Sequence, residues 1–464
     1  MINYLRSIFS EKEVALLGFG REGKSTFNLL RKIFPTKGIT IFDENGSVRT
    51  DSLLVEDPNV FIVTGRGCMQ GIDVFDIAVK SPGIPSNALP MELSRVILTS
   101  QTDIFLQFYS KQVIGITGTK GKSTTSSLVY HILTEADRKA LFVGNIGIPP
   151  FECINEISPE TCIVMELSSH QLEYLAHSPH ISILLNIFQE HLDHYHSFEA
   201  YQQAKLSIAR FLTYNDYFIY NADNELLSSL VEQLPERNYT SIPFSLKPGS
   251  PVAMSVENDW ITLKKGNEKI KLYDISLGQP LKGNHNLYNI MAATAACYLA
   301  GVGMHEIGTG VQTFSGLEHR IEAIGEYEGI FWYNDSIATI PEATIEAVRT
   351  LQTVDTLILG GFDRGIDYSL LYDYLPASGI RNIIFIGEAG KRMLVEFSET
   401  GKNNLQCITT ANFDEVVAMA HQITQIGTIC LLSPAAASYD MFMNFEERGN
   451  VFKSKVREIT PSQC

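Results

Sequence analysis

The sequence is short of the features that mark membrane, secreted and disulfide-linked proteins. Its 464 residues include no run approaching about 18 consecutive apolar residues, the length that a transmembrane helix needs. The first residues, MINYLRSIFSEKE, lack the apolar core and cleavage site of a signal peptide. The seven cysteines are scattered without a CxxC pair, which disfavours a disulfide framework and a zinc site. We therefore expect a cytoplasmic protein with reduced thiols and no membrane insertion.

Basic residues are also scarce. Lysine and arginine number 36 against 52 aspartates and glutamates, the formal net charge is −16, and no segment forms a basic stripe. Because nucleic acids are bound largely through lysine and arginine contacts to phosphates, this balance disfavours nucleic acid as a partner. An anionic ligand would have to be held locally, by loop amides, individual cations or metal ions.

What the sequence does contain is a regular alternation of apolar, strand-like segments with amphipathic, helix-like ones. This alternation is typical of doubly wound α/β domains with parallel sheets. The expected strands include VALLGFG, ITIFD, IAVKSPG, VIGITGT, CIVMELS, ISILLNI, TLILGG, NIIFIG and ICLLSPA. The length indicates about three domains. Breaks near residues 103 and 315 predict domains at 1–103, 104–315 and 316–464, and short alternating runs over 240–282 predict a small antiparallel insertion.

Two glycine-rich loops of similar sequence each follow a predicted strand. The first, GFGREGKST at residues 18–26, satisfies the phosphate-loop pattern G-x-x-x-x-G-K-[ST]. The second, GITGTKGKSTTS at residues 115–126, has Ile116 where the leading glycine of that pattern belongs. An ordinary turn from strand to helix is the alternative for either loop.

The segments that follow the loops favour the second as the ATP site. About 20 residues after the first loop a strand ends in Asp43, which is the spacing of an acid that contacts a ribose or base in Rossmann-type domains. The strand TCIVMELS after the second loop ends in Glu166. A carboxylate there, with the hydroxyl of Ser123 after Lys122, suits Mg²⁺ bound to a nucleotide triphosphate.

Lys205 lies on an apolar helical stripe. In SFEAYQQAKLSIARFL, Phe198, Tyr201, Ile208 and Leu212 recur at helical spacing, and Lys205 falls on the same face. Burial can lower the pKa of a lysine to roughly 5 to 6. The resulting amine can react with CO₂ to give a carbamate, an anion that can bridge metals. The alternative is a lysine that extends from the edge of the stripe to solvent.

His191 lies upstream of this helix and carries an imidazole suited to the same metal ion. It stands in a cluster with His194 and His196. A surface histidine or a transition-metal site are the alternatives, although no HxxxH or HExxH zinc spacing is present.

Several motifs in order resemble those of the Mur ligase family. They are GTKGKST, ELSSHQLE, N-x₄-HLDHYH with its following AK, GNHNLYN, GLEHRIE, NDSIAT and LSPAAAS-x₆-FEERG, and they span essentially the whole chain. Within the family the resemblance is strongest to ligases that add D-glutamate to UDP-N-acetylmuramoyl-L-alanine in peptidoglycan precursor synthesis. It implies an N-terminal Rossmann-like domain that binds the UDP-sugar, a central ATPase domain and a C-terminal Rossmann-like domain that binds the amino acid.

The resemblance also implies a mechanism and a set of site residues in a protein expected to be a monomer. ATP would phosphorylate a substrate carboxylate, and the amine of D-glutamate would attack the acyl phosphate, with two Mg²⁺ ions and a carbamylated Lys205. Catalytic roles would fall to Lys122, His191 and Lys205, and the metal ligands would be Ser123, Glu166, His191 and Lys205. The implied ATP site comprises Gly118, Thr119, Lys120, Gly121, Lys122, Ser123, Thr124, Asn286, Asn289, Arg320 and Asp335. The implied UDP-sugar site comprises Arg21, Glu22, Asp43, Ser81, Asn145, Ser168 and Gln171, and the implied D-glutamate site comprises Thr339, Arg364, Ser438 and Phe445.

The sequence departs from the family pattern at two charged positions. Ile337 stands where NDSKAT motifs usually have lysine, which removes a cation, and Arg364 replaces another lysine and keeps its charge. Glu190 replaces an aspartate before the metal histidine, and Tyr439 stands in the amino-acid pocket. Thr339 and Glu342 also have the spacing of a helix capping box, so Thr339 could be a cap, and the helix N-terminus could face an anion.

Other functions remain open at this level. Another Mur-type or a folylpolyglutamate-type ligase is the nearest alternative. GFGREG with Asp43 is compatible with an NAD-dependent oxidoreductase, and the loss of a lysine at Ile337 is compatible with a UDP-sugar-binding protein that has no catalytic activity.

Overall fold

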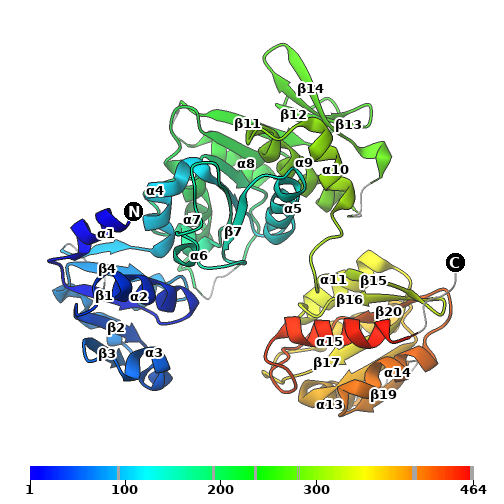
Figure 1. Ribbon diagram of the computed structural model, residues 1–464. Helices are drawn as coiled ribbons and strands as arrows, with labels where there is room; N and C mark the ends of the chain where they lie inside the picture. The colour runs from blue at the N-terminus through cyan, green and yellow to red at the C-terminus, as the bar shows by residue number, and fades with distance from the viewer. Residues whose placement is uncertain are drawn as a thin grey trace. The chain divides into compact units, whose positions relative to one another are not determined.

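The computed structural model describes residues 1–90, 95–190, 194–234, 238–278, 281, 283–399 and 405–459. The chain forms two compact units, Met1–Phe314 and Ser315–Cys464 (Figure 1). The second unit starts beside the predicted break at 315. The predicted break at 103 stays a prediction, and helix α4 (Gln101–Tyr109) runs across it.

The first unit begins with a parallel sheet of five strands in the order β3-β2-β1-β4-β5. Its central strand VALL is buried on both faces, as expected for a parallel sheet covered by helices. The order reverses between β1 and β4, and at such a switch point the crevice outside the strands' carboxyl ends binds ligands. The elements are α1 (Ile2–Phe9), β1 (Val14–Leu17), α2 (Arg21–Ile33), β2 (Ile39–Asp43), η1 (Gly46–Thr50), α3 (Ser52–Val55), β3 (Val60–Thr64), η2 (Cys68–Val74), β4 (Ile77–Lys80), η3 (Ser86–Ala88) and β5 (Ile97–Thr99).

A second sheet of nine strands has the order β14-β13-β12-β11-β10-β9-β6-β8-β7. Strands β8, β6 and β9 are neighbours and parallel, so the segments after them meet at one edge. The elements are η4 (Ser110–Gln112), β6 (Val113–Thr117), α5 (Lys122–Glu135), β7 (Ala140–Gly144), η5 (Pro150–Glu152), β8 (Cys162–Glu166), α6 (Ser169–Leu172), β9 (Ile181–Leu184), α7 (Phe198–Arg210), β10 (Tyr217–Asn221), α8 (Glu225–Glu232), β11 (Thr240–Ser245), β12 (Met254–Glu257), β13 (Trp260–Lys265), β14 (Glu268–Asp274), η6 (Ile275–Leu277), α9 (Asn284–Leu299) and α10 (Met304–Thr313).

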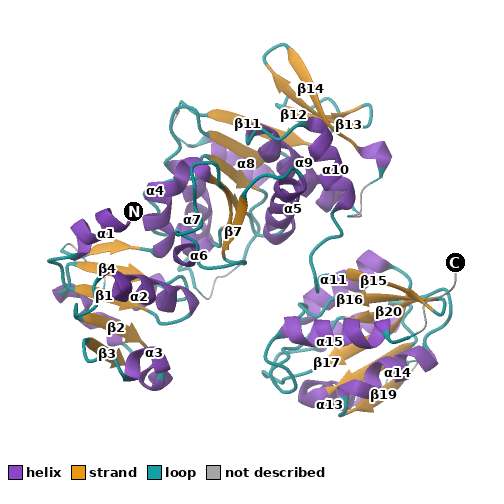
Figure 2. Cartoon of the chain, viewed as in Figure 1, coloured by secondary structure: helices purple, strands orange, loops and turns teal. Residues whose placement is uncertain are grey.

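The predicted antiparallel insertion at 240–282 was partly wrong. Strands β12, β13 and β14 do pair antiparallel, as Figure 2 shows at one end of the sheet. Strand β11 instead pairs parallel with β10, and β12 pairs parallel with β11. Helix α8 supplies the crossover that a parallel β10–β11 pair requires, so the insertion extends the main sheet.

The second unit contains a sheet of six strands in the order β15-β16-β20-β17-β18-β19. All neighbours are parallel except the β15–β16 pair, which confirms the predicted α/β class with parallel sheets. The elements are β15 (Glu322–Tyr327), β16 (Ile330–Asn334), α11 (Pro341–Leu351), β17 (Val354–Gly360), α12 (Ser369–Tyr374), η7 (Leu375–Ala377), β18 (Asn382–Ile386), α13 (Gly387–Glu399), β19 (Gln406–Thr410), α14 (Phe413–Ile423), β20 (Ile429–Leu432) and α15 (Phe445–Arg457). No helix among the described residues is long and apolar enough to cross a membrane.

Candidate active site

The first glycine loop makes a tight turn between β1 and α2. Gly18 has φ +84°, a conformation that glycine adopts without strain. A Cβ at Gly23 would lie 2.2 Å from the carbonyl oxygen of Gly18, so only glycine allows the helix to approach the strand this closely. The amide of Phe19 donates to Oδ2 of Asp43 at 2.8 Å, and the amide of Asn45 donates to Oδ1 at 2.9 Å. Asp43 therefore fixes the loop from the neighbouring strand.

Lys24 is the lysine of the loop that matches the phosphate-loop pattern more closely. It forms an ion pair with a carboxylate. Its Nζ lies 2.6 Å from Oδ2 of Asp51 and 5.9 Å from the centre of the Phe19 ring. The side chain is 44% exposed, so this is a solvated surface ion pair.

A pocket of about 400 Å³ lies beside this loop. It is lined by six of the seven residues predicted for the UDP-sugar, together with loop glycines and the Pro82–Ile84 segment; the six are Arg21, Glu22, Asp43, Ser81, Asn145 and Gln171. Arg21 donates from Nη2 to the carbonyls of Gly144 and Asn145, both at 3.0 Å. Segments that are far apart in the sequence thus close one pocket.

The seventh residue, Ser168, does not line this pocket. Its hydroxyl accepts the amide of Gln171 at the start of α6, and the Gln171 Oε1 accepts the amide of Ser168, which is a complete capping box. The same Gln171 donates from Nε2 to Oε1 of Glu22 at 2.6 Å. Burial raises the pKa of Glu22, and its Oε2 has no hydrogen-bond partner among the described residues.

The second loop encloses its lysine. Lys122 Nζ donates to the carbonyls of Gly118 at 2.9 Å and Thr119 at 3.0 Å, across the loop's own main chain. A Cβ at Gly121 would lie 2.5 Å from Oδ1 of Asn289, so this glycine permits α9 to reach the loop. Lys120 pairs with Glu190 at 2.8 Å. Ser123 and Thr124 follow in the first turn of α5 and are half-buried.

Two features behind the loop were only partly foreseen from the sequence. Asn289 donates to Asn286 Oδ1 at 3.1 Å, so the two predicted adenine contacts lie together at the start of α9. The hydroxyls of Tyr201 and Thr119 lie 2.8 Å apart and join α7 to the loop. From the sequence, Tyr201 is expected only to form part of the apolar stripe. The hydroxyl of a tyrosine on that stripe is the feature that could have indicated a polar contact.

Glu166 is fully buried where β8 ends beside the second loop. Its Oε1 accepts Nδ2 of Asn145 at 2.7 Å, and its Oε2 accepts the hydroxyl of Ser126 at 3.4 Å. Asn145 also lines the first pocket. One amide side chain therefore links the predicted UDP-sugar pocket to the predicted metal carboxylate.

Lys205 is buried as the helical stripe predicted, with 2% of its surface exposed. Its Nζ donates to Thr117 Oγ1 at 3.1 Å and to the Gly118 carbonyl at 2.8 Å. No carboxylate lies within ion-pair distance of it among the described residues. Burial, aided by the charge of Lys122, holds the pKa of Lys205 well below its usual value. These contacts place an amine of reduced basicity directly under the phosphate loop.

The second metal ligand predicted with Lys205, His191, lies outside the described residues. Among the residues that the structure describes, no group of three histidine, cysteine or carboxylate side chains could hold a metal by itself. Nearby, Glu173 joins Lys80 at 3.0 Å to His194 at 2.7 Å, and all three are buried or nearly so. Sequence reasoning missed this cluster because Lys80, the last residue of β4, belongs to no motif.

In the second unit, Asp335 follows β16 and is buried. Its Oδ1 accepts the amide of Ile321 at 3.1 Å, and its Oδ2 accepts the hydroxyl of Ser433 at 2.7 Å. Burial raises the pKa of Asp335 to about 7. Arg320, one residue before Ile321, is exposed. The carboxyl group of Asp335 thus fixes the segment that presents Arg320.

The predicted amino-acid residues lie on the loops at the carboxyl ends of this sheet. Arg364 Nη2 donates to the carbonyl of Thr339 at 3.3 Å, which brings two of them together. Ser438 is buried, and Phe445 begins α15, where its carbonyl accepts the hydroxyl of Ser336 at 2.8 Å. The predicted capping box at Thr339 was wrong.

Helix α11 has Ile340 at its N-cap and no side-chain cap. Pro341 occupies the first helical position, which needs no hydrogen-bonded amide, and it holds Ile340 in the extended region. Thr339 therefore lies outside the helix and is available for other contacts.

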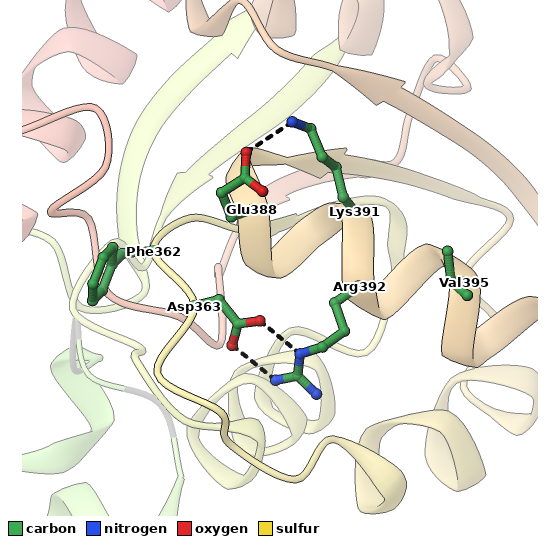
Figure 3. A pocket seen from close by; sticks show the side chains of 6 residues that line it. All are labelled: Phe362, Asp363, Glu388, Lys391, Arg392 and Val395. Carbon is green, nitrogen blue, oxygen red and sulfur yellow. Dashed lines mark hydrogen bonds and ion pairs between the residues drawn. The ribbon is translucent and has the colours of Figure 1, made fainter.

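A second pocket, of about 610 Å³, lies against α13 (Figure 3). Arg392 forms a bidentate pair with Asp363, from Nε at 2.7 Å and from Nη2 at 2.9 Å, and Lys391 pairs with Glu388 at 2.8 Å. Because Asp363 precedes Arg364, the bidentate pair anchors the loop that carries Arg364.

The sequence was compared with models of protein families and with known proteins. A model described as the Mur ligase middle domain matches residues 116–297. A UDP-N-acetylmuramoylalanine–D-glutamate ligase of Acetivibrio thermocellus is 32% identical over 469 residues, covering 99% of each chain. The ligase of that name from Symbiobacterium thermophilum is 34% identical, covering 86% of this chain and 88% of its own. The chain belongs to the Mur ligase family.

Solved Mur ligases share the fold. A MurF structure from Acinetobacter baumannii superposes with a TM-score of 0.57 at 16% identity, covering 95% of this chain and 93% of that one. At that identity the likeness concerns the fold alone. The sequence relatives confirm the family resemblance inferred from the motifs, and the roles of individual site residues stay predictions.

The carboxyl group of Asp335 should make the stability of the protein depend on pH. Its pKa rises from 3.8 to about 7 on folding, so its stabilising contribution is complete below pH 3.8 and is lost as pH rises through about 7. Asp335→Asn keeps an acceptor for the Ile321 amide and cannot ionise. We expect the Tm of this variant, relative to the parent protein, to be higher at pH 8 than at pH 5 by at least about 2–4 °C in thermal unfolding.

Asp363→Asn is the control for this measurement. Its pairing with Arg392 holds the pKa of Asp363 below 3.8, so the group is ionised across the same pH range. The Tm difference for that variant should be the same at both pH values. A constant difference for Asp335→Asn as well would contradict the prediction.

Proposed function

We propose that the chain is an ATP-dependent ligase that joins D-glutamate to UDP-N-acetylmuramoyl-L-alanine and releases ADP and phosphate. The observation that carries this proposal is Asn145, which lines the first pocket and donates to Glu166 beside the second loop at 2.7 Å. A UDP-sugar in that pocket would extend its carboxylate toward the phosphate loop. The names of the full-length relatives supply the substrates.

We assign the UDP-sugar to residues 1–103, ATP to 104–315 and D-glutamate to 316–464. In the proposed reaction, the terminal phosphoryl group of ATP passes to the carboxylate of the alanyl substrate, and ADP leaves. The amine of D-glutamate then attacks the acyl phosphate, and the tetrahedral intermediate expels phosphate to leave an amide. The enzyme is proposed to act as a monomer in the cytoplasm, in the synthesis of peptidoglycan precursors.

The cations of the second loop fit this chemistry. Lys122 lies over the loop's own carbonyls, and a triphosphate would draw its ammonium toward the transferred group. The amides of residues 118–124 would hold the phosphates, and Asn286 and Asn289 would contact the adenine. We also assign Arg320 and Asp335, which belong to the second unit, to the binding of ATP.

The donor set fits Mg²⁺ only if Lys205 is modified. Glu166 and Ser123 are oxygen ligands of the kind that Mg²⁺ prefers. The ammonium of Lys205 would repel the ion, whereas its carbamate would contribute two oxygen donors, and His191 would complete the set. When bound, the metal neutralises charge on the phosphates. Burial without a carboxylate partner is what makes Lys205 a reactive amine.

The residues proposed for D-glutamate are Thr339, Arg364, Ser438 and Phe445. Arg364 keeps the positive charge that its position requires and can hold a carboxylate through two parallel hydrogen bonds. Its hydrogen bond to the main-chain carbonyl of Thr339 supports this grouping, because it brings the two residues together.

The decisive assay is phosphate release from ATP. We expect release with D-glutamate and UDP-N-acetylmuramoyl-L-alanine together, and only a background rate with either substrate alone or with L-glutamate. The amide product should be identified by mass. If the UDP-sugar binds and no phosphate is released with both substrates, the chain is a binding protein, and the substitution at Ile337 would be the first explanation to test.

The two loop lysines should have unequal effects. Lys122→Ala removes a cation aimed at charge that develops on the phosphoryl group, so we expect kcat to fall by at least about 10² to 10³. Lys24→Ala breaks only an exposed ion pair with Asp51, so its kcat and KM for ATP should stay near those of the parent, with any effect in the KM for the UDP-sugar. Loss of ATP turnover in Lys24→Ala with nearly normal Lys122→Ala would reverse the assignment of the loops.

Lys205 should carry a carbamate in the active enzyme. Lys205→Ala should nearly abolish ligation, and short carboxylic acids that fill the vacated space should partly restore it. Protein equilibrated with ¹³CO₂ should show a carbamate signal by NMR that is absent from the variant. Lys12→Ala, at a surface lysine, is the control. An alanine variant with full activity in CO₂-free buffer would contradict the role.

A further inference from the structure

Arg448, in the first turns of α15, is completely buried, although its side chain ends in a guanidinium group. Nη2 donates to the carbonyls of Ser336 at 2.8 Å and Ala436 at 3.1 Å. Nη1 donates to the carbonyl of Ala437 at 3.1 Å, and Nε donates to the hydroxyl of Ser336 at 3.0 Å. Every one of these acceptors is neutral.

No carboxylate within ion-pair distance of Arg448 is found among the described residues. Asp440 acts on it from farther away, and burial raises the pKa of that carboxyl group. Burial lowers the pKa of Arg448 to about 10, so the guanidinium still carries its charge near neutral pH. A buried charge without a counter-ion is costly, and carbonyl dipoles offset that cost only in part. Arg448 therefore contributes a buried positive charge that no carboxylate in direct contact offsets among the described residues.

The acceptors of Arg448 come from loops at the carboxyl ends of neighbouring strands. Ser336 follows β16, and Ala436 and Ala437 follow β20. The loop after β17 also approaches, because a Cβ at Gly361 would lie 2.9 Å from Nη1. Strands β16, β20 and β17 are adjacent in the sheet, and ligands of parallel sheets bind at this edge.

These loops carry the residues proposed for D-glutamate. Thr339 lies three residues after Ser336, Ser438 follows Ala437 directly, and Arg364 lies three residues after Gly361. The loop after β16 also contains the uncharged Ile337, between Ser336 and Thr339. Arg448 thus holds the main chain of two of these loops and contributes a buried positive charge, on which Asp440 acts only from a distance.

We propose that Arg448 is a positioning residue of the D-glutamate pocket, whose buried charge favours an acidic amino acid over a neutral one. It does so without contact to the substrate, by holding the loops after β16 and β20 and by adding a positive potential to the pocket. This inference rests on the proposed function, and it adds a residue and a source of specificity to it.

The test compares the full-length Arg448→Met and Arg448→Lys variants with the parent. Removal of the charge in Arg448→Met should raise the KM for D-glutamate about tenfold or more and leave the KM values for ATP and the UDP-sugar within about threefold. Inhibition by glutarate, a dicarboxylate without an amine, should weaken by the same factor. Arg448→Lys keeps the charge and loses most of the hydrogen bonds, so its KM for D-glutamate should return to within about threefold of the parent value.

Lys453→Met is the matched control on the same helix. Lys453 is also buried, but its charge is compensated by Glu322 at 3.0 Å and Glu318 at 3.5 Å. Its loss should lower the Tm without a selective change in the KM for D-glutamate. If Lys453→Met raises that KM as much as Arg448→Met does, the effect is general destabilisation and the proposal is overturned.

The folding of the variants and the pattern of the three KM values also bear on the role of Arg448. If Arg448→Met does not fold, Arg448→Lys decides, because a tenfold higher KM for D-glutamate at a native Tm would show that the hydrogen bonds matter and the charge does not. Equal changes in all three KM values would mean that the substitution affects the whole enzyme, and they would overturn the inference. Failure of the proposed function would look different, since the parent protein itself would then release no phosphate with D-glutamate and would not be inhibited by glutarate.

Discussion

The ammonium of Lys205, buried against the main chain of the phosphate loop, is the constraint on which the central site depends. Its Nζ donates hydrogen bonds to Thr117 Oγ1 and to the Gly118 carbonyl, so α7, which carries Lys205, supports the loop. Tyr201, one helical turn earlier, binds the hydroxyl of Thr119 and extends the same support. Burial, together with the charge of Lys122, lowers the pKa of Lys205, and the proposed carbamylation rests on this position.

The two glycine loops have similar sequences, but their lysines have different surroundings. Both begin α-helices after buried parallel strands, and both need glycine where a helix or side chain approaches closely. They differ in what surrounds the lysine. Asp51 draws Lys24 to the surface, whereas Lys122 has the carbonyls of its own loop, and Glu166 lies at the end of the adjacent strand β8. The proposed assignment of the triphosphate to the second loop therefore rests on the neighbouring strands and not on the loop sequence.

The second unit uses buried groups of opposite character at the edge of its sheet. Asp335 is held by an amide and a hydroxyl in a site that favours its neutral form, while Arg448 keeps its charge among carbonyls. Both fix loop segments between strand ends and the residues proposed to bind ligands. At this edge, two buried ionisable groups are held by hydrogen bonds to neutral partners, whereas the Asp363–Arg392 ion pair is partly exposed.

Much of the fold could be predicted because the strands of buried parallel sheets are continuous apolar runs, and those runs are visible in the sequence. The sequence also placed Lys205 on an apolar stripe, and it singled out the carboxylate that ends β8 and six of the residues that line the first pocket. The spacing at Thr339 allowed a capping box, which is absent because Pro341 sets the start of the helix, and β11 was expected to be antiparallel, whereas its direction depends on the crossover through α8. Periodicity and motifs are local and follow from composition and spacing. The burial of Arg448, within the acidic segment FEERG, and the meeting of Asn145 with Glu166 were decided by the tertiary structure, because only packing between distant segments removes water from these groups and supplies their partners.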